Sequence, residues 1–167
     1  MNSFRTGGEK NSCECENCIE RPSDYYIMML NDLDKRLTDL GIDTKIVFLA
    51  YADVSWAPVK EHFCNKDRFT LMLAPSGRSY EHGFDSITDP RSYESVPYVK
   101  NKSSSPSDIG KCAKLLSEWQ DVFDGDSFDF DYHLFARQWR DLGGMYIARR
   151  VFLDMQNLDR LSLNGMV

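Results

Sequence analysis

The spacing of apolar positions along the chain predicts three helices. Between residues 23 and 40 they recur every three or four positions, which places them on one helix face: Tyr26, Leu30, Leu33, Leu37 and Leu40. We expect Ser23 or Asp24 to cap this helix, because short polar side chains accept hydrogen bonds from the first free N–H groups. The same spacing predicts a second helix over residues 107–125 and a third over residues 146–161.

Short apolar runs between these helices predict buried strands. Residues 45–51 and 68–74 are nearly continuous apolar segments, which is typical of strands covered on both faces. Residues 127–134 alternate between aromatic and polar side chains, and another strand begins at Gly165. A short helical turn is expected over residues 58–63. Strands that alternate with helices indicate an α/β architecture with a parallel sheet.

Composition and charge narrow the class of protein. The chain has 167 residues, of which 42% are hydrophobic and 28% charged, as in a globular domain. It is too short for a complete (β/α)8 barrel, which needs roughly 200 residues. A net charge of −6 without a Lys/Arg cluster argues against a nucleic-acid partner. No apolar run is long enough for a membrane span, and the N-terminus lacks the apolar core of a secretory signal.

Three cysteines lie within six residues near the N-terminus, at Cys13, Cys15 and Cys18. Their thiolates can supply three of the four ligands of a tetrahedral zinc site, with Cys64 or His62 as the fourth. A Cys15–Cys18 or Cys13–Cys18 disulfide and unpaired thiols are the alternatives. The sequence therefore leaves structural zinc open as a cofactor, and we expect no cofactor for catalysis.

Several features together carry a resemblance to a known family. In chain order they are the Cys-x-Cys-x-x-Cys motif at residues 13–18, Ser-Asp-Tyr-Tyr at 23–26, Asn31, Leu-Ala-Tyr at 49–51, the helix that carries residues 116–119, and Phe-Asp-Tyr-His at 130–133. In this order they resemble a bacterial domain-of-unknown-function family that is similar to α-glucuronidase-like glycoside hydrolases of polysaccharide-degrading bacteria.

The resemblance implies a partial TIM barrel. The strands at 45–51, 68–74 and 127–134 would be its fifth, sixth and seventh, and the eighth would begin at Gly165. Residues 1–22 would be an irregular Cys-containing loop and 23–167 the partial barrel domain. The first half of the barrel is not in this sequence, so the chain would be a fragment or a degenerate gene product. The resemblance also implies that full-length relatives are secreted or periplasmic.

The strand over residues 127–134 supplies the main catalytic candidates. Asp129, Asp131 and His133 alternate along it, and residues near the carboxyl ends of barrel strands face the active site. A pair of carboxyl groups cleaves glycosidic bonds in most glycoside hydrolases. We expect Asp131 to be the catalytic carboxylate and Asp53, just after the first strand, to be the second candidate. Asp53 as a helix N-cap and the polar residues as an exposed edge are the alternatives.

Substrate contacts are expected from aromatic and basic side chains around the same strand ends. The long segment 75–107 follows a strand and contains Arg78, whose guanidinium suits a uronate carboxylate, and Tyr80, whose ring suits a sugar face. An ordinary surface loop with its own hydrophobic cluster is the alternative. The remaining substrate-binding candidates are Tyr51, Tyr132 and His133, although Tyr132 can instead face the helices.

The sequence thus predicts the second half of a glycoside-hydrolase-like barrel that acts on polysaccharides or glycans and is inactive by itself. A non-catalytic carbohydrate-binding module, a zinc-stabilised module and a nonfunctional remnant remain alternatives. A half-barrel exposes strand edges and the apolar side chains that would line the barrel, here Val47, Leu49 and Leu71. We therefore expect self-association, or association with the missing half, in addition to a carbohydrate ligand.

Overall fold

The computed structural model describes residue 13 and residues 21–102, 104–134 and 141–167. Their helices and strands, in chain order, are α1 (Pro22–Asp39), β1 (Ile46–Ala50), β2 (Phe69–Leu73), α2 (Ile109–Val122), β3 (Ser127–Asp129) and α3 (Met145–Gln156). Short 3-10 turns connect them, at Ala52–Ser55, Lys66–Arg68, Phe84–Ser86, Pro90–Ser92 and Leu158–Leu161. No helix in the described part of the chain is long and apolar enough to cross a membrane.

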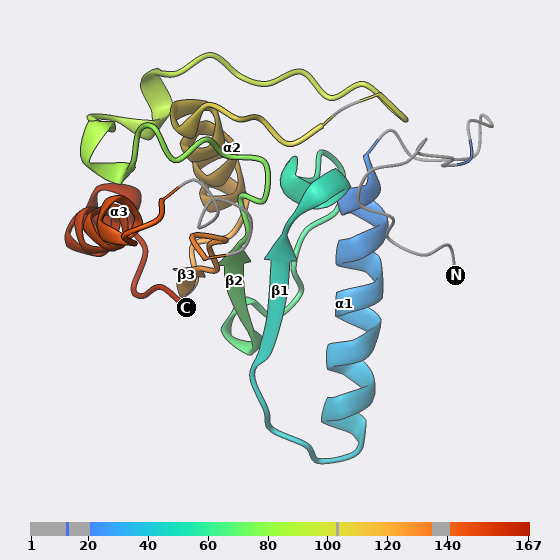
Figure 1. The fold of residues 1–167 in the computed structure, drawn as a ribbon. Coiled ribbons are helices and arrows are strands. Elements are labelled where there is room, and N and C mark those ends of the chain that lie inside the picture. Colours follow the sequence, from blue (N-terminus) through green and yellow to red (C-terminus); the bar gives the residue numbers. More distant parts are fainter. Residues whose placement is uncertain (1–12, 14–20, 103, 135–140) are drawn as a thin grey trace.

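The three strands form a parallel sheet in the order β1-β2-β3, as the apolar runs predict. Their carboxyl ends point the same way, toward the long segment between β2 and α2 (Figure 1). Met166 forms a parallel bridge with Asp129, so the chain turns back beside β3 where the sequence predicts another strand. In the described sheet, each strand therefore lies beside the strand that precedes it in the sequence.

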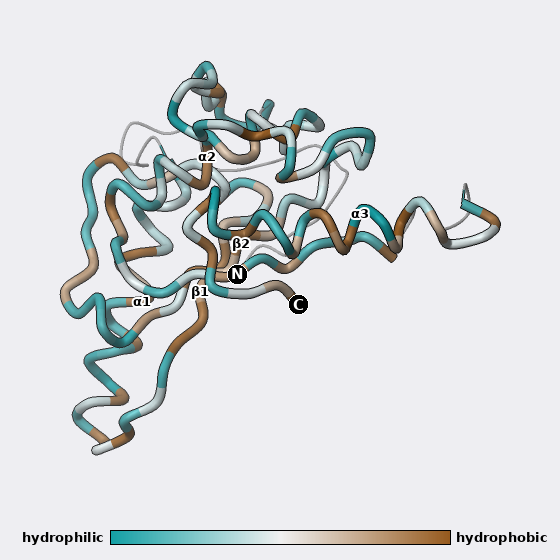
Figure 2. The backbone as a smooth tube through the Cα atoms, turned by 90° about the vertical axis from the view of Figure 1, so that its left-hand side faces the viewer, coloured by the Kyte–Doolittle hydropathy of each residue, from teal (hydrophilic) through white to brown (hydrophobic). Residues whose placement is uncertain are grey.

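One face of the sheet builds the hydrophobic core with α1 and α2. Phe48 of β1 contacts Phe69 of β2, Trp119 and Phe123, with ring centroids 5.0–6.2 Å apart. The predicted apolar face of α2 is buried throughout, and Asp108 caps this helix by accepting a hydrogen bond from the Lys111 N–H. Figure 2 places α1 and α3 on opposite sides of the strands. Helix α2 therefore packs on the face of the sheet that carries Phe48, and α3 lies toward the opposite face (Figure 2).

Helix α1 is correctly predicted in position, but only part of the predicted stripe is buried: Leu30 is in the core and Tyr26 packs against it, whereas Leu33 and Leu40 are exposed. Its N-cap is Arg21 with Pro22 in the first turn, so the helix begins just inside the segment expected to be a loop. The buried positions are Ser23, Asp24, Ile27, Leu30 and Asp34, whereas Leu40 is 72% exposed. Three polar residues occupy this face because each has a partner in the fold, and an apolar pattern cannot reveal such positions.

Three further expectations need correction. Residues 58–63 contain no helical turn; the turns lie on either side, at Ala52–Ser55 and Lys66–Arg68. The strand expected over residues 127–134 ends at Asp129, after which the chain leaves the sheet. The last helix ends at Gln156, where Asn157 adopts a non-helical conformation before the final 3-10 turn.

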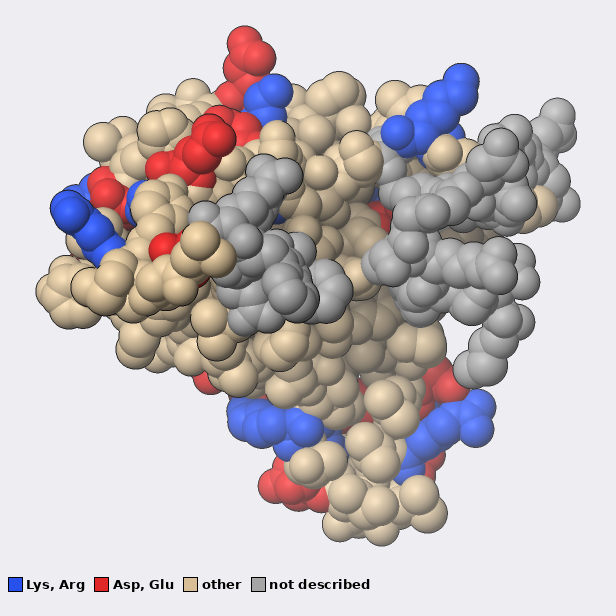
Figure 3. Space-filling view, in the orientation of Figure 1, with Lys and Arg blue, Asp and Glu red and all other residues tan. Residues whose placement is uncertain are grey.

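The other face of the sheet is only partly covered. Val47 is 46% exposed and Phe130 is 36% exposed, while Leu49, Met72 and Phe128 are half-buried. The register aligns Leu49, Met72 and Phe128 as one row across the three strands. Figure 3 shows a broad area without charged side chains between the charged groups at its lower edge and those at its upper left. Leu71, which was expected on this face, is fully buried on the opposite, helix-covered face.

Candidate functional site

Four of the predicted site residues come together at the carboxyl end of the sheet. Arg78 and Tyr80 lie in the segment that follows β2, and Asp131 and His133 follow β3. The carboxyl edge of a parallel sheet is where α/β proteins place their ligands, because the loops that leave the strands meet there. A fifth residue, Asp154 of α3, completes what we call the carboxyl-end cluster.

Asp131 accepts hydrogen bonds from both of the residues that follow β2. Its Oδ2 lies 2.5 Å from Arg78 Nη1, and its Oδ1 lies 2.6 Å from the Tyr80 hydroxyl. The backbone N–H of Tyr132 also donates to Oδ1, at 2.6 Å. The side chains of Arg78 and Asp131 have no exposed surface, so this ion pair is held inside the fold. Burial and the negative charge of Asp131 raise the pKa of the Tyr80 hydroxyl, which keeps it a donor.

Asp154 connects the cluster to helix α3. Its Oδ2 lies 2.6 Å from Arg78 Nη2 and 3.0 Å from His133 Nε2, and its Oδ1 accepts the Phe84 N–H at 2.8 Å. Burial alone would raise the pKa of Asp154, but the bond with His133 and the charge of Arg78 outweigh it, so the pKa is lowered. Gly83 makes the approach of the loop possible, because a Cβ at this position would overlap Asp154 and Arg150.

Asp129, the last residue of β3, is the unusual member of this region. Its side chain is completely buried, and neither carboxyl oxygen has a hydrogen-bond partner among the described residues. Burial and the nearby charge of Asp131 raise the pKa of Asp129 well above its usual range, despite the opposing charge of Arg78. A buried, unpartnered carboxyl group is costly in a folded protein and calls for an explanation.

Arg78 is a cationic partner that Asp131 and Asp154 share. Burial lowers the pKa of Arg78, but the two carboxylates raise it by more, so the guanidinium stays charged. The ring of Tyr80 also faces Arg78, with the guanidinium carbon 4.7 Å from the ring centroid. Cys112 lies nearby on α2, and burial raises the pKa of its thiol to about 12. This thiol is therefore neutral at physiological pH.

The cluster also contains a group that could hold a metal ion. One ligand atom from each of Asp131, His133 and Asp154 lies within 4.8 Å of the others. Two carboxylates and an imidazole are ligands that zinc and other divalent transition metals accept. The arrangement can therefore act in two ways, as a network that binds and orients a polar ligand or as a metal centre.

The other two tyrosines of the predicted site, Tyr51 and Tyr132, form a separate pair beside the cluster. Tyr132 is half-buried, and burial followed by a hydrogen bond with Tyr51 raises the pKa of its hydroxyl. Tyr51, also half-buried, is the N-cap residue of the 3-10 turn Ala52–Ser55. Asp53 lies within this turn and close to Tyr98, so it is not the N-cap, and no described contact joins it to Arg78 or Asp131.

The cysteine motif falls mostly outside the described residues. Cys13 is exposed, whereas Cys15 and Cys18 lie in the part of the sequence that the structure does not describe. Of the two fourth-ligand candidates, the exposed Cys64 donates its backbone N–H to Asn31, and the His62 carbonyl accepts from the same side chain. Zinc at this motif therefore stays a prediction.

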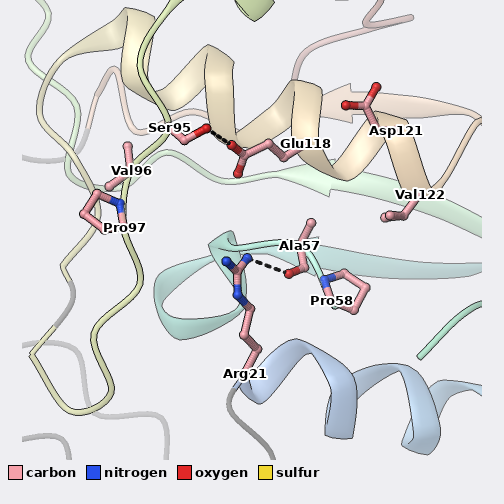
Figure 4. Close-up of a pocket in the computed structure, with 9 residues that line it drawn as sticks. All are labelled: Arg21, Ala57, Pro58, Ser95, Val96, Pro97, Glu118, Asp121 and Val122. Carbon is pink, nitrogen blue, oxygen red and sulfur yellow. Dashed lines mark hydrogen bonds between the residues drawn. The ribbon is translucent and has the colours of Figure 1, made fainter. Parts of the chain in front are cut away.

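A pocket of about 400 Å³ lies elsewhere, between the start of α1 and the outer face of α2 (Figure 4). Its lining residues are Arg21, Ala57, Pro58, Ser95, Val96, Pro97, Glu118, Asp121 and Val122. Its charged groups already have partners: Arg21 donates to the Ala57 carbonyl, and Glu118 accepts from Ser95. None of the predicted site residues lines this pocket, so it adds nothing to the site.

Asp154 is the cluster residue that sequence reasoning missed. It sits on the one buried side of an otherwise exposed helix, at a spacing of seven from the buried Ile147. That spacing is the signal that could have singled it out, since a charged residue on a core-facing position needs a partner. No protein-family model, curated protein or solved structure matches this chain.

Proposed function

We propose that this chain is part of a glycoside-hydrolase-like protein related to α-glucuronidases, and that it contributes a carbohydrate site at the carboxyl ends of its strands. The observation that carries the proposal is the meeting of Arg78, Tyr80, Asp131 and His133, which come from two different loops. The parallel strand order β1-β2-β3 supports a partial barrel, in which consecutive strands are neighbours.

The two carboxyl groups near the end of β3 suit the chemistry of glycoside hydrolysis. Asp131 is ion-paired with Arg78, whereas Asp129 is buried without a hydrogen-bond partner among the described residues and its pKa is raised well above its usual range. Pairs of carboxyl groups serve as acid and base in such enzymes. In the proposed full-length protein, Asp131 would be the catalytic carboxylate.

The chain alone is proposed to be inactive. The side chains of Arg78, Asp131 and Asp154 have no exposed surface, so a sugar cannot touch them directly in this arrangement. The accessible part of the site is the half-buried pair Tyr51 and Tyr132, whose rings can stack on a sugar. We therefore expect weak glycan binding at the tyrosine pair and no hydrolysis.

Glycan binding and turnover test the two parts of this proposal separately. Binding of oligosaccharides, uronate-containing ones included, is followed by NMR shifts, and turnover is assayed with aryl glycosides and an aryl glucuronide. We expect Tyr132→Ala to weaken binding several-fold, while Tyr25→Ala, a change at an exposed tyrosine of α1, leaves it unaltered. Absence of binding to any glycan would overturn the carbohydrate site. Turnover by the chain alone would overturn its inactivity.

A zinc-stabilised module is the second candidate, and the spacing of Cys13, Cys15 and Cys18 within six residues is the observation that favours it. Thiolates so close together can supply three of the four ligands of a structural zinc site. We propose structural zinc at Cys13, Cys15 and Cys18, in line with the spacing of these thiols. Zinc analysis of the purified chain, with Cys13→Ser as the variant and Cys112→Ser as the control, decides whether this motif holds the ion.

A further inference from the structure

We propose that Asp129, Asp131, His133 and Asp154 form a site for a divalent transition-metal ion at the carboxyl end of the sheet. Zinc is the probe that the ligand set suits best, because an imidazole joined with carboxylates favours zinc over calcium or magnesium. This site is independent of the cysteine motif and does not depend on the carbohydrate function.

The first argument is the spacing of the ligand atoms. His133 Nε2 lies 3.0 Å from Asp154 Oδ2 and 3.8 Å from Asp131 Oδ2. Ligands about 2.1 Å from a tetrahedral zinc ion are about 3.4 Å from one another. The two measured separations lie on either side of this value. Small side-chain movements therefore bring the three atoms around one ion.

The second argument is Asp129, which is independent of that triad. Both of its oxygens are buried and have no hydrogen-bond partner among the described residues, although it lies close enough to feel the charges of Asp131, Arg78 and Asp154. A metal ion would give this carboxyl group the partner that it lacks. Asp129 lies outside the triad whose ligand atoms are within 4.8 Å of one another, so its side chain would have to turn toward the ion to fill the fourth position.

The third argument is charge. Two carboxylates, those of Asp131 and Asp154, share one guanidinium, that of Arg78, so the ion pairs leave one negative charge in excess. A cation bound beside them would compensate this charge. Arg78 need not leave, because a carboxylate oxygen has two lone pairs and can accept from Arg78 while it binds the ion. Arg78 would then orient two metal ligands, as groups around bound metals commonly do.

The test is zinc binding by the chain after chelator treatment, measured by isothermal titration calorimetry with zinc chloride. Because Cys13, Cys15 and Cys18 can also bind zinc, the parent protein carries Ser at all three positions. We expect one ion per chain and a rise in the melting temperature. Asp129→Asn should weaken binding by more than about tenfold, since it removes a ligand and keeps the shape of the side chain. Asp39→Asn, an exposed change at the end of α1, should have no effect.

A second variant and a spectroscopic measurement keep the test decisive if Asp129→Asn fails to fold. His133→Gln keeps a group that can hydrogen-bond to Asp154 but removes the imidazole ligand, so it should also abolish binding. The cobalt form of the Cys-free parent should show the absorption of oxygen and nitrogen ligands. Absence of metal binding by this parent would overturn the proposal. It would also be overturned if Asp129→Asn and His133→Gln bound zinc as tightly as the parent protein does.

Discussion

Arg78 is the residue on which the carboxyl-end cluster depends. It joins the segment after β2 to Asp131 and to Asp154 of α3, with both hydrogen bonds inside the fold. Removal of one partner from a buried ion pair leaves the other charges uncompensated, which costs far more than the net contribution of the pair. We therefore expect Arg78→Met to lower the free energy of unfolding by about 3–5 kcal/mol, as measured by urea denaturation.

The matched control is Arg91→Met. Arg91 also pairs with an aspartate, Asp121, at 2.7 Å, but both side chains are more than half exposed. Surface pairs of this kind contribute little, because water screens the charges. The denaturation midpoint of Arg91→Met should stay close to that of the wild type. Equal losses in the two variants would show that the cluster is not a stabilising network.

At this scale the sequence predicts residue types better than it predicts their partners. Period-two alternation places Asp129, Asp131 and His133 on one side of a strand, and the last two do meet, although the strand has ended before them. Asp131 and His133 thus meet in the loop that follows the strand, and not because they alternate along it. Asp154 could not be assigned a partner, because nothing local in α3 indicates that Arg78, 76 positions away, would reach it.

Among the elements, α1 is held to the fold by polar side chains as much as by apolar ones. Asp24 Oδ1 accepts the backbone N–H groups of Val59, Lys60 and Glu61, at 2.8–3.1 Å. Asp34, at the other end of the buried face, pairs with the buried Arg68 at 2.6 Å. Apolar periodicity located this helix and its buried Leu30, but it missed the buried carboxylates, because charged residues are normally expected to face solvent.

Asp24→Ala should therefore destabilise the chain although it touches no apolar core residue. The substitution leaves three N–H groups of the segment after β1 without their acceptor, and hydrogen bonds to a charged group are each worth about 1.5–3 kcal/mol. We expect a loss of at least about 2 kcal/mol, measured by urea denaturation. Asp39→Ala, near the exposed end of the same helix, is the control and should shift the midpoint little. Similar losses in both would mean that the three hydrogen bonds to Asp24 do not stabilise the fold.

For the molecule as a whole, the strand pattern predicts the parallel sheet, whereas the barrel remains a proposal. The outer edge of β1 indicates whether a further barrel strand could pair there. The Leu49 N–H, which does not pair with β2, donates to the Tyr26 hydroxyl of α1 at 3.1 Å. A further strand on this side would have to displace Tyr26, because the same N–H would be needed for pairing. A partner for the chain is therefore more readily accepted on the open face of the sheet than along this edge.

That face supplies the last prediction, which concerns association. The row Leu49, Met72 and Phe128 is half-buried, and Val47 beside it is 46% exposed. Apolar surface that is continuous across strands favours burial against another molecule. We expect the purified chain to dimerise or aggregate in light scattering. Val47→Lys should shift it toward the monomer, because a charge on this face opposes its burial.

The matched control is Leu40→Lys, which places the same charge on a more exposed apolar residue, 72% exposed, at the end of α1 and away from the sheet. If association is driven by the sheet face, Leu40→Lys leaves the measured mass unchanged while Val47→Lys reduces it. If both variants reduce it equally, added charge alone is responsible. A wild-type chain that is a monodisperse monomer at all concentrations would mean that the 167 residues close their own core without a partner.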